Sequence, residues 1–184
     1  MSLLEWIAVA FNLAYVILLA REIVWAWPCG IIGSALVLLV VYDARLYIDS
    51  GLYVFYMVLG AYGWYLWVFG DRDRPELPII RTPRRQALGL LLLGSLGTVV
   101  MGYLFGTYTE ADIPYWDAFT TSFSLVGTWM QARKHLENWL LWLVVDAVYV
   151  GVYAYKGLVA FAILSGVYLL LASYAYWNWR RLMG

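Results

Sequence analysis

The second half of the chain repeats the first half at a fixed offset of 112 positions, without a gap. The two copies span roughly residues 12–67 and 124–179. Apolar matches are common in a chain with 64% hydrophobic residues, whereas Arg and Trp matches are not. Such duplications are typical of membrane transporters, in which the substrate site lies between the halves near the bilayer midplane. The informative matches are Ala20-Arg21/Ala132-Arg133, Trp27/Trp139, Tyr56/Tyr168, Tyr62/Tyr174 and Trp67/Trp179.

Seven apolar segments make up most of the chain, and only 13% of its residues are charged. Each segment has roughly the 20 residues that cross a bilayer as a helix. The N-terminus lacks the basic region of a cleavable signal peptide and carries Glu5 there. The sequence therefore predicts an all-α membrane protein with seven transmembrane helices. We expect them at Leu3–Ala20, Ile23–Tyr42, Gly51–Gly70, Ala87–Phe105, Tyr115–Ala132, Asn138–Tyr155 and Leu158–Trp177.

The order of these segments predicts three helices, a linker helix and three more helices. The repeats occupy residues 1–70 and 115–184, and residues 71–114 hold a charged, proline-containing loop and the linker helix. The linker helix is rich in Leu and Gly, which indicates contact with lipid or simple packing. Because the repeats begin four helices apart, they have the same orientation, as in the SWEET sugar facilitators.

The distribution of Lys and Arg predicts the orientation in the membrane. With the N-terminus outside and the C-terminus inside, ten basic residues lie on the inner side and two on the outer side, a strong positive-inside bias. The ten are Arg21, Arg72, Arg74, Arg81, Arg84, Arg85, Arg133, Lys134, Arg180 and Arg181, and the two are Arg45 and Lys156.

The fifth segment is the most polar of the seven. Asp117, Thr121, Ser124, Thr128 and Gln131 fall on one helical face. Polar stripes in membrane helices face protein or a water-filled path. Hydrogen bonding between helices is the alternative, and we favour the lining of a cavity.

Asp146 is the residue with the strongest chemical signal. It lies about 10 Å from the inner end of the sixth segment at 1.5 Å per residue, near the bilayer midplane. A carboxylate there costs several kcal/mol unless it is paired or hydrated, and no Lys or Arg lies at that depth. The carboxyl group could be neutral and hydrogen-bonded, could hold an inorganic cation, or could face a pathway for a polar or cationic substrate.

Trp139 and Trp142 project from the same helical face as Asp146. Aromatic rings beside a carboxylate suit a flat, cationic ring. The alternative is the interfacial aromatic belt, which is equally good for Trp139 and less so for the deeper Trp142. Four other tryptophans at helix ends are predicted to belong to this belt, namely Trp64, Trp67, Trp177 and Trp179.

The repeat supports a common polar centre. Asp146 corresponds to Ser34, and Ser124 corresponds to Asn12, so both pairs are polar at the same depth. A pseudo-twofold axis would bring these four residues together.

The second segment carries a possible hinge. Pro28, Gly30 and Gly33 lie beside Ser34 and are predicted to interrupt the helix. Close packing through glycine is an equally good interpretation.

The chain has no G-x-x-x-x-G-K-[ST] phosphate loop and no plausible nucleophile–base pair. His135, the single histidine, is predicted at a membrane surface, and no ligand cluster for a metal is present. We therefore expect neither an enzyme nor a resident metal or cofactor. A structural membrane subunit and an intramembrane enzyme remain as weaker alternatives to a transporter.

The run from Glu137 to Asp146, ENWLLWLVVD, resembles the Pnu family of vitamin transporters, which has a W-x-x-W-x-x-x-[N/D] pattern on its sixth core helix. The nicotinamide riboside type tends to have Asn where this chain has Asp146, and Gln where it has Tyr53. Further similar stretches are Trp27–Gly33, Leu46–Asp49, Tyr62–Trp67, Lys156–Leu158 and Trp177–Trp179.

This resemblance implies a full-length SWEET-like arrangement in a bacterial inner membrane, a homotrimer, and facilitated diffusion of a vitamin that a cytoplasmic kinase then traps. Nicotinamide riboside is the first candidate and thiamine the alternative, and riboflavin or a deoxynucleoside are further family substrates. No nucleic-acid partner is expected. The candidate substrate-binding residues are Asn12, Ser34, Tyr53, Thr121, Ser124, Thr128, Asn138, Trp139, Trp142 and Asp146.

Flux through the protein in liposomes should follow the substrate gradient alone. The reason is that the chain has no ATP-binding motif and a single isolated midplane carboxylate. Accumulation against the gradient, driven by an imposed proton or sodium gradient, would contradict this expectation.

Overall fold

The computed structural model describes residues 3–43, 47–70, 77–109 and 112–183. The first and sixth predicted segments have the observed bounds, and the others differ by a few residues at their ends. The helices are α1 (Leu3–Ala20), α2 (Ala26–Asp43), α3 (Tyr47–Phe69), α4 (Arg84–Tyr108), α5 (Pro114–Ala132), α6 (Asn138–Tyr155) and α7 (Val159–Leu182).

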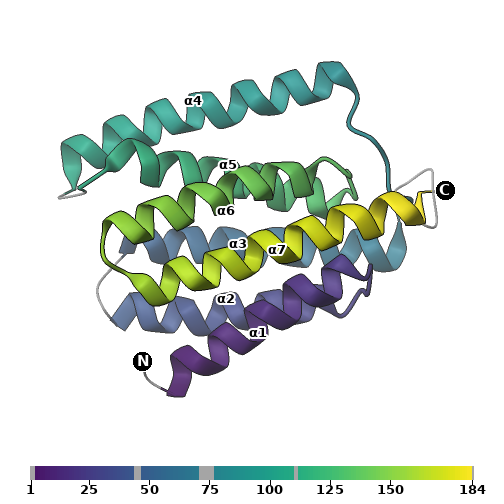
Figure 1. The fold of residues 1–184 in the computed structure, drawn as a ribbon, viewed down its shortest axis with the longest axis horizontal. Helices are drawn as coiled ribbons and strands as arrows, with labels where there is room; N and C mark the ends of the chain where they lie inside the picture. The colour runs from purple at the N-terminus through teal and green to yellow at the C-terminus, as the bar shows by residue number, and fades with distance from the viewer. Residues whose placement is uncertain (1–2, 44–46, 71–76, 110–111, 184) are drawn as a thin grey trace.

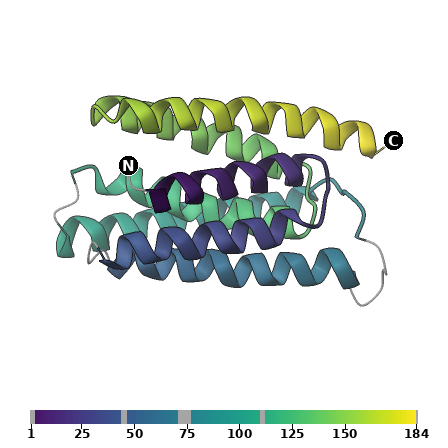
Figure 2. The same cartoon turned by 90° about the horizontal axis from the view of Figure 1, so that it is seen from below.

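The helices lie side by side along the long axis of the molecule (Figures 1 and 2). Within the first group α2 contacts α1 and α3, and within the second group α6 contacts α5 and α7. The groups meet where α3 contacts α5 and where α1 contacts α7. Helix α4 lies at one edge of the bundle, and α5 is the helix it contacts among the described residues. Most of the large apolar side chains of α4 are exposed, as expected for a helix against lipid.

Four of the described helices are long and apolar enough to cross a membrane, namely α3, α4, α6 and α7. The apolar parts of α1 and α2 are shorter. Helix α5 does not meet the same criterion, because its polar stripe lowers its mean hydropathy. The count of seven transmembrane helices and the parallel, SWEET-like orientation of the repeats stay predictions.

Four tryptophans join the two groups at one end of the bundle, which we call the tryptophan end. Ring centroids are 5.6 Å apart for Trp27 and Trp67, 6.0 Å for Trp67 and Trp179, and 5.4 Å for Trp179 and Trp139. The rings therefore follow the order Trp27, Trp67, Trp179, Trp139, in which the two outer residues and the two inner residues are each related by the 112-residue offset. The two groups meet at the middle of this chain of rings, between Trp67 and Trp179.

The indole N–H groups at the middle of this chain bind helix ends of the opposite group. Trp67 Nε1 donates to the carbonyl of Ala132 in α5 at 3.2 Å, and Trp179 Nε1 donates to the carbonyl of Leu19 in α1 at 3.0 Å. Carbonyls in the last turn of a helix have no partner within the helix. Each repeat thus satisfies a helix terminus of the other.

The prediction that Trp67 and Trp179 belong to the aromatic belt is wrong. Trp179 is fully buried and Trp67 is half-buried between the groups, whereas Trp64 and Trp177 are 42% and 60% exposed, as a belt requires. A position at a helix end sets the depth of a residue. It does not say whether the side chain faces lipid or the neighbouring repeat.

An ion pair closes the same end of the bundle between two equivalent positions. Glu22 and Lys134, which are related by the offset, bind each other, and the Lys134 ammonium also lies 4.5 Å from the centroid of Trp67. Both residues have a left-handed backbone, with φ of 59° and 53°, in the turns that follow α1 and α5. Left-handed residues commonly end helices, usually as glycine. Here the two turns carry opposite charges that meet.

The predicted interruption of the second helix by Pro28, Gly30 and Gly33 is wrong. Helix α2 is continuous from Ala26, and Pro28 occupies its first turn, where an N–H has no helical partner in any case. A Cβ on Gly30 would lie 2.7 Å from the Tyr15 ring, and one on Gly33 would lie 3.0 Å from the Asn12 amide. Close packing of α1 on α2 therefore accounts for both glycines.

The segment before α4 docks on the turn between α5 and α6. Ile80 and His135 form a β-bridge, and the Thr82 hydroxyl donates to Glu137 Oε2 at 2.8 Å. His135 is 1% exposed in this contact, and burial lowers the pKa of its imidazole. The predicted surface position of His135 is thus covered by the chain itself.

Trp179→Phe should lower the melting temperature of the detergent-purified protein by several degrees. The substitution keeps an aromatic ring but removes the indole N–H that donates to the Leu19 carbonyl, a hydrogen bond worth about 1 kcal/mol. Trp177→Phe is the matched control, because this neighbour is exposed. Equal melting temperatures for the two variants would contradict the proposed role of the indole N–H.

Candidate functional site

A cavity of about 620 Å³ lies between the two groups of helices. Its described lining comes from α1–α3 and α5–α7, and no residue of α4 contributes. Nine pairs of lining residues are related by the 112-residue offset, so the wall is built twice from equivalent positions. The pairs are Asn12/Ser124, Val16/Thr128, Trp27/Trp139, Gly30/Trp142, Ser34/Asp146, Val37/Tyr149, Tyr53/Ser165, Tyr56/Tyr168 and Gly60/Ala172.

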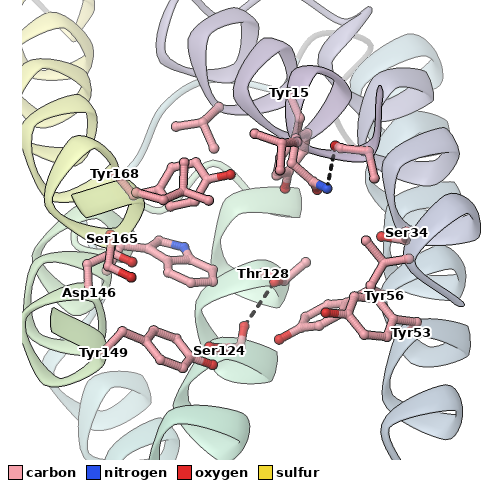
Figure 3. Close-up of a pocket in the computed structure, with 18 of the residues that line it drawn as sticks. Tyr15, Ser34, Tyr53, Tyr56, Ser124, Thr128, Asp146, Tyr149, Ser165 and Tyr168 are labelled. Carbon is pink, nitrogen blue, oxygen red and sulfur yellow. Dashed lines mark hydrogen bonds between the residues drawn. The ribbon is translucent and has the colours of Figure 1, made fainter. Parts of the chain in front are cut away.

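Equivalent residues face each other across the cavity (Figure 3). Asp146, Ser165 and Tyr168 lie on the α6–α7 side, and their partners Ser34, Tyr53 and Tyr56 lie on the α2–α3 side. Ser124 and Thr128 of α5 lie between the two sides, where the Thr128 hydroxyl donates to the Ser124 carbonyl at 2.9 Å. The arrangement is symmetric in position and asymmetric in chemistry, because only one side carries a carboxylate.

Asp146 is the one charged residue among the described residues that line the cavity. Its side chain is 5% exposed, and it forms no hydrogen bond or ion pair with the described residues. Ser165 and Tyr168 of α7 lie beside it (Figure 3). A buried carboxylate is stable only with a partner or with water, so this wall is suited to a cation or to a hydrogen-bond donor.

In each repeat a glycine on one helix packs against a large aromatic ring on the neighbouring helix. The helix that carries the glycine in one repeat carries the ring in the other. Tyr15 of α1 packs on Gly30 of α2. In the second repeat Gly127 of α5 takes the place of Tyr15, Trp142 of α6 takes the place of Gly30, and these two pack on each other. Each repeat thus places one large ring in the cavity wall here. The first repeat does so from its first helix (Tyr15 of α1), and the second repeat from its second helix (Trp142 of α6).

Eight of the ten predicted site residues line the cavity: Asn12, Ser34, Tyr53, Ser124, Thr128, Trp139, Trp142 and Asp146. Thr121 and Asn138 do not. The amide of Asn138 donates to the His135 carbonyl at 2.5 Å and so closes the turn before α6. On the polar face of α5, Asp117 instead pairs with Lys156 at 3.6 Å, which leaves Ser124, Thr128 and Gln131 as the residues of the stripe at the cavity.

Sequence reasoning missed most of the tyrosines of the wall. A signal was present for one pair, because Tyr56 and Tyr168 match under the offset and both line the cavity. Tyrosines in an aromatic-rich membrane chain are hard to distinguish from interfacial ones by sequence. The lining residues that were not predicted as site residues include Tyr15, Tyr56, Gln131, Tyr149, Tyr153, Ser165 and Tyr168.

A cavity between two groups of duplicated helices, several of them apolar enough to cross a membrane, is the architecture of a membrane transporter. The family model described as nicotinamide mononucleotide transporter matches residues 2–181. The chain belongs to this family, which is the PnuC family.

Individual relatives agree with this assignment. The nicotinamide riboside transporters PnuC of Escherichia coli (strain K12) and Shigella flexneri are each 27% identical over 73% of this chain, which spans 66% of their length. The riboflavin/roseoflavin transporter RibM of Streptomyces davaonensis is 29% identical over 95% of this chain and 83% of its own length. A crystal structure of the vitamin B3 transporter PnuC has a TM-score of 0.78 at 21% identity, covering 98% of this chain and 81% of that one, and shows the same fold.

Gly30→Ala should lower the melting temperature of the purified protein, because the new Cβ would lie 2.7 Å from the Tyr15 ring and the ring would have to move. Gly166→Ala on α7 is the control, since nothing lies within 4 Å of its added Cβ. Alanine is favoured over glycine in helices by about 1 kcal/mol, so the control should be unchanged or slightly more stable. Equal effects of the two substitutions would show that the Tyr15 ring is not held by Gly30.

Proposed function

We propose that the protein mediates facilitated uptake of a vitamin with a flat, cationic ring, and that nicotinamide riboside is its substrate. The observation that carries this proposal is the isolated carboxylate of Asp146, one helical turn from the Trp142 indole, in a cavity whose described lining contains no basic residue. A pyridinium ring can stack on an indole and be attracted by a carboxylate at the same time.

Asp146 distinguishes among the vitamins that the resemblance and the relatives suggest. Nicotinamide riboside and thiamine both carry a positively charged ring, whereas riboflavin is neutral and gains no charge attraction. Riboflavin remains a candidate because RibM is a riboflavin/roseoflavin transporter by name. Thiamine is the alternative substrate, and a structural subunit is disfavoured by a cavity between the repeats that contains a buried carboxylate.

We also propose the cellular setting that the sequence predicts. The tryptophan end would face the cytoplasm of a bacterium, since Arg21, Arg133, Lys134 and Arg180 lie there or beside it. The protein would work in the inner membrane as a homotrimer. A cytoplasmic kinase would phosphorylate the vitamin, which keeps the concentration of the free vitamin lower inside the cell than outside.

Asp146→Asn should weaken binding of nicotinamide riboside and thiamine by about tenfold or more, the scale of one charge-assisted contact in a desolvated site. Riboflavin, being neutral, should be affected much less. Calorimetry on purified wild type and variant with the three ligands side by side measures these differences.

Trp142→Ala should also weaken binding by more than ~1 kcal/mol through loss of the cation–π contact. Trp64→Ala, at an exposed position on α3, is the control and should bind as wild type does. Wild type that binds riboflavin but neither cationic vitamin would refute the proposed substrate. Equal losses in Trp142→Ala and Trp64→Ala would indicate general damage to the fold.

A further inference from the structure

Gln131 is a buried amide at the tryptophan end of the cavity wall. Its side chain is 2% exposed and lines the cavity from the last turn of α5. In the first repeat the equivalent residue is Leu19, so the amide occurs on one side of the pseudo-symmetric cavity. Because the other repeat folds with an apolar residue at this position, the fold does not need an amide here.

The Tyr15 hydroxyl fixes the orientation of this amide. It donates to Gln131 Oε1 at 3.2 Å, across the boundary between the two repeats. This is the hydrogen bond that the structure gives the Gln131 side chain among the described residues. With its oxygen engaged, the amide has its NH₂ group left to donate.

The Tyr15 ring is itself held in place from two directions. Gly30 leaves the space into which the ring packs, and Trp27 meets it edge-on at 5.9 Å between centroids. A hydroxyl on a ring with so little freedom can impose one orientation on the amide that it contacts. Tyr15 is thus a positioning residue for Gln131.

We infer that Gln131, oriented by Tyr15, is the hydrogen-bond donor that recognises a carbonyl group on the ring of the substrate. The inference rests on the proposed function and deepens it, because it narrows the substrate to carbonyl-bearing rings.

The positions along the helices fit a ligand that reaches both polar groups. Asp146 lies seven residues beyond Trp139, about 10 Å along α6 at 1.5 Å per residue, and Gln131 lies near the level of Trp139 at the tryptophan end. Trp142 lies between the two levels. A pyridinium ring stacked on Trp142 could turn the edge that holds its ribose-bearing, charged nitrogen toward Asp146 and its carboxamide toward Gln131.

The chemistry of the two polar groups is complementary. An ionised Asp146 accepts hydrogen bonds and cannot donate one. The carbonyl of a substrate carboxamide therefore needs a hydrogen-bond donor elsewhere in the cavity, and the Gln131 NH₂ group is that donor. Thiamine has no carbonyl on its rings, so this contact favours a nicotinamide ring over thiamine.

The test compares two ligands on three proteins by calorimetry. The ligands are nicotinamide riboside and the same ribosylpyridinium without its carboxamide, and the proteins are wild type, Gln131→Leu and Tyr15→Phe. Leucine is the residue that the first repeat has at the equivalent position, so the substitution should fold. Tyr65→Phe, at an exposed position on α3, is the control for the tyrosine substitution.

We expect wild type to bind nicotinamide riboside about tenfold more tightly than the analogue, the scale of one hydrogen bond in a desolvated site. This preference should disappear in Gln131→Leu and shrink in Tyr15→Phe, while binding of the analogue changes by no more than about twofold in either. Equal losses for both ligands, or an unchanged preference in Gln131→Leu, would overturn the inference and leave the proposed function standing.

The remaining outcomes concern wild type itself. If it binds neither cationic ligand but binds riboflavin, the proposed substrate fails. The inference then stands only if Gln131→Leu weakens riboflavin, whose ring system carries carbonyl groups. If wild type binds thiamine and not nicotinamide riboside, the inference is overturned. If it binds none of these vitamins, both proposals fail.

Discussion

The cavity depends on how the two repeats are tied together at the tryptophan end. Trp67 and Trp179 each donate an indole N–H to the last turn of the first helix in the opposite repeat. Glu22 and Lys134, at equivalent positions, pair across the same junction. Lipid tails are as apolar as the helix surfaces, so burial of apolar area does not drive helices together in a bilayer. Packing and hydrogen bonds that cross the junction must therefore hold the repeats together, and these contacts occur at helix ends, where backbone carbonyls are left over by the helix.

A duplicated architecture gives a cavity whose two walls have the same positions, and the chemistry of the site comes from the positions at which the repeats differ. Asp146 faces Ser34, Trp142 replaces Gly30, and Gln131 replaces Leu19. Where the repeats agree, as at Trp27 and Trp139, the residues pack with the tryptophan chain. Some positions that are alike in both repeats, such as Tyr56 and Tyr168, also line the cavity, whereas the positions that differ give one side of it a carboxylate, an indole and an amide. This asymmetry lets a pseudo-symmetric cavity bind a ligand that has no symmetry.

Much of the fold could be predicted because segment lengths and the 112-residue offset survive in the sequence. The bounds of α1 and α6 were predicted to the residue, and Asn12, Ser34 and Asp146, which were predicted to come together, line one cavity. The errors about the tryptophans have one physical cause: depth in the membrane follows from sequence position, whereas direction around the helix axis depends on the neighbouring helices. Trp67 and Trp179 have the depth of belt residues but face the other repeat. Pro28 was predicted to interrupt a helix that in fact begins two residues before it, where proline costs nothing.

The same distinction explains why the cavity tyrosines and Gln131 were not predicted as a set. Gln131 was predicted on a polar stripe, yet its significance depends on Tyr15, which lies 116 residues earlier in the chain and on another helix. Tyr15 in turn is held because Gly30 leaves room for its ring. Each of these three residues has an ordinary explanation when taken singly: a polar helix end, an aromatic membrane residue and a small packing residue. Their function follows only from the contact between the repeats, because that contact aligns a fixed hydroxyl with a buried amide and leaves the amide with one group free to donate.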